Sequence, residues 1–361
     1  MSGIFGALNL ADTDRAFVNT IGQRVVYDAV QQIIERHNAD LQAAYSVFVD
    51  EETSDFKRRF KLPGGGYLQR RGGSGQSAAV KAFGEWDVAF PLEDFGAQFS
   101  KNDIAVAYMT VQELNRHLLT IFAQDINTMR REILVALLNN TAWTFTDLIH
   151  GALSVQPLAN GDAVLYPPVL GSDAEATDTH YLESGYTSAS ISDTNNPFVT
   201  IRNELEEHFG VATGGENIAV FINPDEVSVT EALTDFDPVN DKYVIPGANV
   251  DQLTGLPANV PGRVIGRTNG CWVIEWRWIP SGYMVGIYME PGVPKPLIKR
   301  NDPADTGLTT GLTLVVEDEI YPFKNAHYRH RYGLGVGNRL NGVVMELANG
   351  AGYTVPAAYA R

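Results

Sequence analysis

Three glycines alternate near the C-terminal end of the sequence, at Gly333, Gly335 and Gly337 in the stretch HYRHRYGLGVGNRLNGVVMEL. A glycine-rich loop binds phosphate when G-x-G-x-x-G follows a strand and opens a helix. Here Asn338 takes the place of the third glycine, and no amphipathic helical pattern follows. The spacing therefore predicts a strand, on which the missing side chains let another segment approach closely, and not a phosphate site.

The histidines of the HYRHR stretch are candidates for metal binding. His327 and His330 are three residues apart, a spacing that could place two ligands on one helical face. Arg329 and Arg331 would repel a bound cation. A cationic surface for carboxylates is the better interpretation, with the nearby VEDEI stretch (316–320) as a candidate partner.

Cys271 is the only cysteine, so neither an intramolecular disulfide nor a thiolate metal cluster can form, which fits a reducing compartment. It begins an apolar stretch, where a lone cysteine is typically a core residue. The sequence contains no G-x-S-x-G, no H-E-x-x-H and no Walker loop. We predict no catalytic residue, no cofactor and no metal ligand, although a site assembled from distant residues stays open.

Composition limits the functional classes further. The 361 residues are 44% hydrophobic and 19% charged, which is typical of a globular protein. The net charge of −16 disfavours a protein that grips DNA through clustered cations. The opening MSGIFGALNL does not resemble a signal peptide, and no apolar run approaches the roughly 20 residues of a membrane span. We expect a soluble protein that is intracellular at synthesis.

A basic stretch from about residue 46 to 90 is expected to form a long hairpin. SVFVDEETSDFKRRFKL alternates as a strand, and the tip PGGGYLQRRGGSG (63–75) is rich in glycine. An isolated hairpin is marginally stable in water, so we expect its cations to contact another molecule, with a solvated surface loop as the alternative. These cations are Lys57, Arg58, Arg59, Lys61, Arg70 and Arg71.

Helical patterns occur in three places. Near the N-terminus, one helical face is expected to carry Val25, Val26, Ala29, Val30, Ile33 and Ile34. Thr110 and Glu113 have the spacing of a capping box, which predicts that a long amphipathic helix begins there and ends near Asn139. A shorter helix is expected over 196–210, with Pro197 near its start.

Strand patterns follow in the second half of the sequence. In CWVIEWRWI (271–279), alternation places Trp272, Ile274, Trp276 and Trp278 on one face, which is typical of a core. There is no regular βαβ alternation, so the order of elements predicts an α+β fold. The expected strands are 216–224, 262–268, 271–279, 283–289, 312–316 and 339–345.

In this order of elements the chain resembles the major capsid proteins of tailed bacteriophages, whose Hong Kong-97 fold is shared with encapsulins. The basic hairpin is similar to the extended E-loop of that family. WDVAFPLEDFGAQF, leading into the long helix, is similar to the entry into the spine helix. NPFVTIRNELEEHFG followed by ENIAVFINP resembles the helix and strand of the A-domain, and RYGLGVGNRLNGVVM resembles the last P-domain strands.

The resemblance implies a division of the chain. It consists of an N-terminal arm (1–45), an extended hairpin or E-loop (46–90), a P-domain (91–195) with its spine helix at 110–139, an A-domain (196–310) and C-terminal strands returning to the P-domain (311–361). The three alternating glycines, Gly333, Gly335 and Gly337 (the glycine ladder), would then lie along the spine helix. The six hairpin cations would contact a neighbouring subunit.

The function implied is that of a shell protein that assembles with itself into pentamers and hexamers around packaged double-stranded DNA. Its expected location is the virion, after assembly in the host cytoplasm. Partners would include portal, scaffolding and possibly decoration proteins, and the short N-terminal arm favours a separate scaffolding protein. An encapsulin shell around a cargo enzyme is the first alternative. An α+β enzyme using His327, His330 or Cys271 is the second.

Overall fold

The structure, a computed structural model, describes residues 17–61, 68, 85–100, 103–210, 217–239, 260–316, 322–323, 325–350 and 352–361. Packing divides the chain into two units. Unit 1 comprises segments 1–43, 92–130 and 301–333, and unit 2 comprises 44–91, 131–300 and 334–361. Each unit is therefore assembled from segments far apart in sequence. The domain boundaries implied by the resemblance remain a prediction.

Unit 1 contains the helices expected near the N-terminus and after Thr110. The capping box is present, because the Thr110 amide donates to the Glu113 carboxylate at 2.9 Å and the Glu113 amide donates to the Thr110 hydroxyl at 3.2 Å. The helices are α1 (Val18–Ile21), α2 (Gln23–Tyr45), α3 (Asp103–Ala107) and α4 (Val111–Leu138), of which α4 continues into unit 2.

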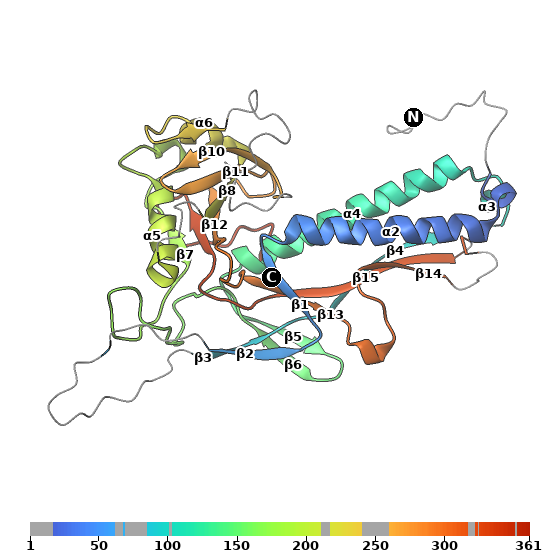
Figure 1. Cartoon of the computed structure of the whole chain (residues 1–361), viewed down its shortest axis with the longest axis horizontal. Coiled ribbons are helices and arrows are strands. Elements are labelled where there is room, and N and C mark those ends of the chain that lie inside the picture. The colour runs from blue at the N-terminus through green and yellow to red at the C-terminus, as the bar shows by residue number, and fades with distance from the viewer. Residues whose placement is uncertain are drawn as a thin grey trace. The chain divides into compact units, whose positions relative to one another are not determined.

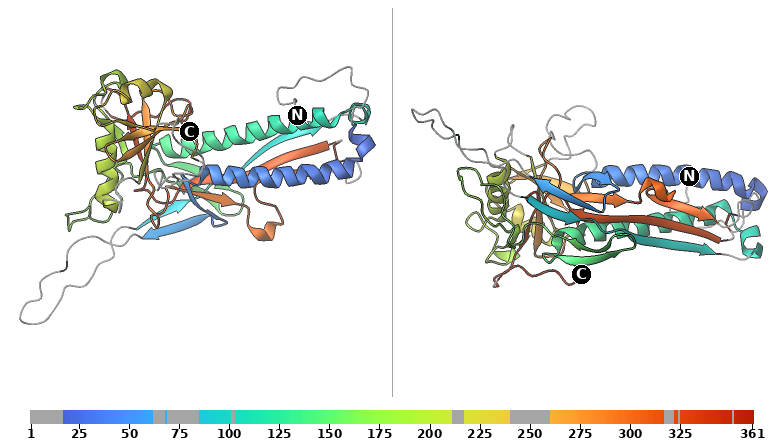
Figure 2. Two further views of the ribbon diagram at one scale, coloured as in Figure 1. Left: turned by 45° about the horizontal axis from the view of Figure 1, so that its top comes forward. Right: turned by 90° about the horizontal axis from the view of Figure 1, so that it is seen from below.

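Helices α2 and α4 lie side by side along three antiparallel strands of unit 1 (Figures 1 and 2). Strand β15 (Asn325–Val336), which ends in unit 2, lies between β4 (Glu93–Ser100) and β14 (Leu312–Val316). A short 3₁₀ turn, η4 (Ala304–Thr306), precedes β14. The four helices share one hydrophobic core with β14 and β15.

The buried face of α2 is narrower than the sequence pattern predicted. Val26, Val30 and Ile34, spaced by four residues, are buried. Val25 and Ile33, which were expected on the same face, are 60% and 45% exposed. Six residues within two and a half helical turns span too wide an arc for all of them to meet the neighbouring helix and strands.

Unit 2 contains a seven-stranded sheet in the order β7-β16-β12-β8-β11-β10-β9. Helix α5 (Pro197–Phe209) packs on it, and its N-cap Asn196 accepts a hydrogen bond from the Phe198 amide at 3.0 Å. The strands are β7 (Tyr181–Glu183), β8 (Ile218–Ile222), β9 (Asp237–Pro238), β10 (Arg263–Thr268), β11 (Cys271–Glu275), β12 (Tyr283–Tyr288) and β16 (Val343–Glu346).

The remaining elements of unit 2 are short. β1 (Val49–Thr53) pairs in parallel with β13 (Leu297–Asn301), whose last residue falls in unit 1, while β2 (Lys57–Lys61) with β3 (Glu85–Ala89) and β5 (Trp143–Asp147) with β6 (Gly151–Val155) form antiparallel pairs. The other turns are η1 (Ser188–Ser190), η2 (Pro224–Glu226) and α6 (Val227–Thr230). Within the described residues, no helix is long and apolar enough to cross a membrane.

Two expected strands differ from those observed. The strand expected over 271–279 ends at Glu275, so Trp276 and Trp278 do not continue its alternation, although Trp276 is buried in the core. The segment 339–345 becomes a strand only at Val343, because Asn338 to Gly342 form a turn region between β15 and β16.

Candidate functional site

The β2–β3 pair is the base of the expected hairpin, and it holds four of the six predicted contact cations. Its antiparallel register places Arg59 opposite Asp87 and Lys61 opposite Glu85. Residues directly opposite each other in such a pair have their side chains close together. Ion pairs between opposite residues therefore connect the two strands of the hairpin base. Arg70 and Arg71, the other two predicted cations, lie outside the described residues.

Each of the four described cations has carboxylate partners in its own chain. Asp87 is 2.8 Å from the Lys57 amine and 2.6 Å from the Arg59 guanidinium, and Glu85 is 2.9 Å from the Lys61 amine. Hydrogen bonds from Arg59 and Lys57 hold the pKa of Asp87 well below its usual range. The sequence pattern indicated a basic arm, but in the structure carboxylates of the same chain neutralise these four cations.

Arg58 is paired on the other side of the hairpin. Its guanidinium donates to Asp55 at 2.7 Å and to the Thr53 hydroxyl at 2.8 Å, and it also donates to Glu51. A hydrogen bond from Arg58 lowers the pKa of Asp55. The sequence could have shown Glu51 and Asp55 as near neighbours. Glu85 and Asp87 could be found only by pairing KRRFK with EWDVA, which lies more than 20 residues later in the sequence.

The inner face of the hairpin base is buried against the rest of unit 2. Trp86, Val88 and Phe90 join a hydrophobic cluster with Ile298 and Leu340. The Trp86 indole N–H donates to the Gly337 carbonyl at 3.3 Å. The β2–β3 pair is thereby packed against the body of unit 2.

The glycine ladder contacts this hairpin base. A Cβ atom on Gly335 would come within 2.6 Å of the Phe90 ring, and one on Gly337 within 2.6 Å of Ile298 and 3.2 Å of Phe60. The prediction of close approach is confirmed for Gly335 and Gly337. The atoms nearest to these two Cβ positions belong to the hairpin base and β13, and residues at the end of α4 line one small cavity together with Gly335.

The HYRHR cations contact carboxylates, as their composition predicted, and the proposed VEDEI partner stays a prediction. Arg329 lies 2.9 Å from Asp94, and Arg331 lies 2.9 Å from Asp302. The acidic residues 317–319 of VEDEI lie outside the described residues. Because HYRHR lies in strand β15, its histidines do not have the helical arrangement that two metal ligands three residues apart would need.

The candidate residues for chemistry lie in structural positions. Cys271 is fully buried in the core of the seven-stranded sheet. The His330 Nδ1–H donates to Asp125 at 2.7 Å, and His37 contacts the other oxygen of Asp125 at 2.9 Å. A second group of titratable side chains, Asp178 with two histidines, was missed because its members are up to 30 residues apart and only packing brings them together.

Comparison with solved structures identifies the fold. A chain of Mycobacterium phage Patience superposes with a TM-score of 0.66 over 96% of this chain and 95% of its own, at 18% sequence identity. The chain has the tailed-bacteriophage capsid fold. Its mixture of helices and strands agrees with the predicted α+β class.

Other chains with the capsid fold align less closely. One from the capsid of Cyanophage P-SCSP1u has a TM-score of 0.48 at 10% identity, over 85% of this chain and 88% of its own. One from the mature capsid of bacteriophage PhiM1 has a TM-score of 0.47 at 11% identity, over 84% and 86%. The fold assignment does not depend on these two. No family model and no curated protein matches the sequence.

Proposed function

We propose that the chain is a major capsid protein of a tailed bacteriophage, which assembles with itself as pentamers and hexamers into an icosahedral shell around double-stranded DNA. The observation that carries this proposal is the capsid fold, which extends over 96% of the chain. Portal, scaffolding and decoration proteins would be its partners, with assembly in the host cytoplasm. A shell protein needs no catalytic residue, and Cys271 and His330 are both buried.

The charge of the chain supports containment of DNA without tight binding. The net charge is −16, and the described cations of the hairpin base are already paired with carboxylates of the same chain. A protein that gripped DNA would need clustered, available cations to release counterions. A shell wall of this composition would hold DNA inside while binding it weakly.

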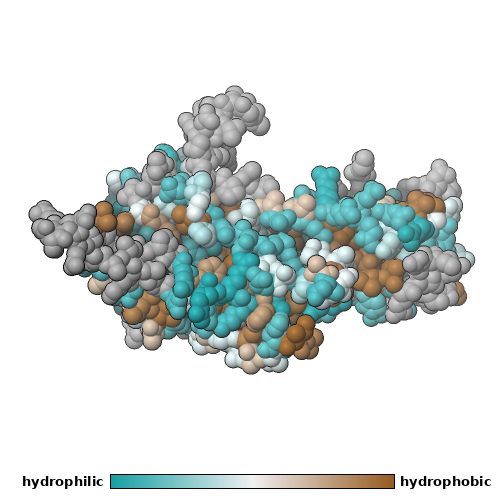
Figure 3. Space-filling view, turned by 60° about the horizontal axis from the view of Figure 1, so that its bottom comes forward, coloured by the Kyte–Doolittle hydropathy of each residue, from teal (hydrophilic) through white to brown (hydrophobic). Residues whose placement is uncertain are grey.

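Exposed apolar side chains support assembly with other copies. The two residues at the β5–β6 turn, Leu148 and Ile149, are 95% and 76% exposed. Ile104 and Tyr108, at α3, are also exposed. Figure 3 shows separate hydrophobic patches within a mostly hydrophilic face. Such patches are typical of surfaces that a protein partner covers.

The contact between the hairpin arm and a neighbouring subunit is part of the same proposal. Its six cations are Lys57, Arg58, Arg59, Lys61, Arg70 and Arg71. A neighbour would compete for the first four with carboxylates of their own chain, so each exposed pair would contribute only about 0–1 kcal/mol. Many repeated weak contacts still close a stable shell.

Negative-stain electron microscopy of the purified full chain, with its elution volume on a sizing column, tests the proposal. Closed particles, or rings of five and six subunits, are expected, and particles from infected cells should contain DNA that nuclease degrades only after the particles are opened. Particles that enclose a protein cargo in place of DNA would favour an encapsulin-type shell. A monomer that no salt or crowding agent assembles would contradict both shells. Alanine substitutions at His327, His330 and Cys271 would then test for an enzyme.

A further inference from the structure

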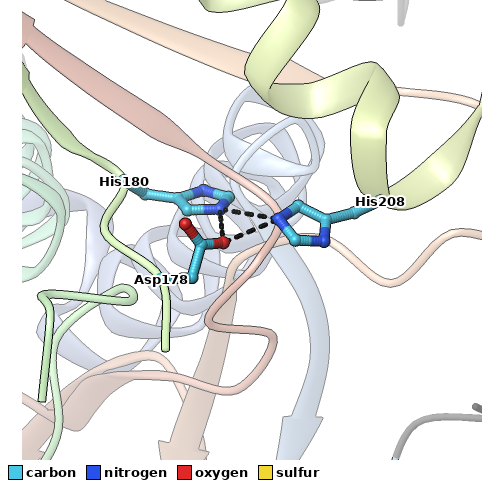
Figure 4. Close-up of side chains that lie close together, drawn as sticks. All are labelled: Asp178, His180 and His208. Atoms are coloured by element: carbon cyan, nitrogen blue, oxygen red, sulfur yellow. Dashed lines mark hydrogen bonds and ion pairs between the residues drawn. The ribbon is translucent and has the colours of Figure 1, made fainter. Parts of the chain in front are cut away.

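Three side chains of unit 2 bring metal-binding atoms together in its interior (Figure 4). Asp178 and His180 lie just before β7, and His208 lies in the last turn of α5. The Asp178 Oδ2 atom is 3.1 Å from His180 Nε2 and 2.7 Å from His208 Nε2, and the two nitrogens are 3.3 Å apart. The side chains of His180 and His208 are 0% and 4% exposed. Three potential ligand atoms thus converge on one buried point.

Hydrogen bonding around the cluster leaves lone pairs directed inward. The His180 Nδ1 atom is 2.8 Å from the Gly342 carbonyl oxygen, which can only accept, so Nδ1 carries the hydrogen. The Nε2 of a neutral His180 then presents a lone pair to Asp178. The single N–H of a neutral His208 cannot form a full hydrogen bond to both acceptors, His180 Nε2 and Asp178 Oδ2. A cation bound between these three atoms would satisfy the His180 lone pair and the Asp178 carboxylate together.

We propose that Asp178, His180 and His208 bind one Zn²⁺ ion, or a similar divalent transition-metal ion. Tetrahedral Zn²⁺ has bonds of about 2.0–2.1 Å, which place its ligand atoms about 3.3 Å apart. Two of the three observed separations, 3.1 and 3.3 Å, are close to this value, and the 2.7 Å between Asp178 Oδ2 and His208 Nε2 would lengthen when the ion binds. Carboxylate oxygens of Glu204 and Glu207 lie within 4.8 Å of that of Asp178, so one of them or a water molecule completes the coordination.

Outer hydrogen bonds orient the proposed ligands. The Thr179 amide donates to Asp178 Oδ1 at 2.7 Å, which leaves Oδ2 for the ion. The Gly342 carbonyl fixes the His180 ring, and the His180 main chain is held by hydrogen bonds to Ala159 and Val344. Partners of this kind set the tautomer and direction of metal ligands. A bound ion would join the end of α5 to the edge of the seven-stranded sheet.

A cluster of the same composition in unit 1 provides a matched control. There His37 and His330 contact the two different oxygens of Asp125, at 2.9 and 2.7 Å. The nitrogens are therefore separated by the whole carboxylate, and each pair is satisfied as an ordinary hydrogen bond. We do not expect this cluster to bind a metal.

The test compares the full-length protein with His208→Gln, Asp178→Asn and the control Asp125→Asn. Each is stripped with a chelator, dialysed against Zn²⁺ and analysed for metal content. We expect about one Zn²⁺ per chain in the wild type and Asp125→Asn. In His208→Gln and Asp178→Asn, the Zn²⁺ affinity should fall at least about tenfold. Co²⁺ in the wild type should give tetrahedral d–d absorption.

A second measurement does not depend on the variants. Zn²⁺ should raise the melting temperature of the stripped wild-type protein, and the chelator should reverse the rise. The proposal is overturned if stripped wild type takes up no Zn²⁺ and its melting temperature does not respond. It is also overturned if His208→Gln, folded by circular dichroism, retains as much Zn²⁺ as wild type, because the ion would then bind elsewhere.

Discussion

Replacing Arg339 with methionine should destabilise unit 2 more than most single substitutions. The Arg339 side chain is fully buried between the β15–β16 turn and the segment after β6. It lies over the Tyr166 ring, with its guanidinium carbon 5.8 Å from the ring centre. Its donors reach four acceptors, at 2.8 Å on Pro157 O, 3.2 Å on Leu158 O, 3.1 Å on Asn160 Oδ1 and 2.9 Å on Asp162 Oδ2.

The expected loss follows from what methionine would leave behind. Methionine fills much of the volume but donates no hydrogen bond, so two main-chain carbonyls, the Asn160 side-chain oxygen and the Asp162 carboxylate lose their donor. Removing one partner of a buried charge pair costs about 3–5 kcal/mol. The Asp162 side chain is 30% exposed, so water can solvate it after the change. We therefore expect a loss near the lower end, about 3 kcal/mol in the free energy of unfolding.

Urea unfolding of the full chain, followed by tryptophan fluorescence, measures this loss against a matched control. Arg263→Met removes an arginine whose side chain is 66% exposed and lies 2.6 Å from Glu275. An exposed pair contributes about 0–1 kcal/mol, so this variant should unfold close to wild type. Equal midpoints for Arg339→Met and Arg263→Met would refute the assigned role of the buried guanidinium.

Three further results are expected. Burial would raise the pKa of Asp125, but hydrogen bonds from its two histidines hold that pKa at about 2, below the value of 3.8 in the unfolded chain. About 2 kcal/mol of the free energy of unfolding should therefore be present above pH 4 and be lost as the pH falls through 2. Acid titration of Asp125→Asn should not show this loss. Gly335→Ala should cost about 1–3 kcal/mol by crowding Phe90, measured as a lower urea midpoint. Arg59→Glu should reduce particle yield in electron microscopy, and adding Asp87→Arg should restore the hairpin but not the yield; full recovery of yield would contradict a contact between Arg59 and a neighbour.

Local patterns predicted the elements whose causes are local. The capping residues Thr110 and Glu113 lie within one helical turn of each other, so the start of α4 could be found from the sequence alone. The helix α5 likewise begins after Asn196, which caps it. By contrast, the partners of Arg59 and Lys61 depend on the register between β2 and β3, which no short window of sequence contains.

The candidate metal site shows the same limit in its clearest form. Both His–Asp–His clusters combine residues from distant segments, and the sequence distinguishes neither from isolated histidines. Their difference lies in geometry, since Asp125 uses both carboxylate oxygens while Asp178 directs one oxygen to both histidines. In the first arrangement each histidine has its own carboxylate oxygen. In the second, three potential metal-ligand atoms lie around one point. Only the second has a reason to bind a cation, so composition alone could not have predicted the site.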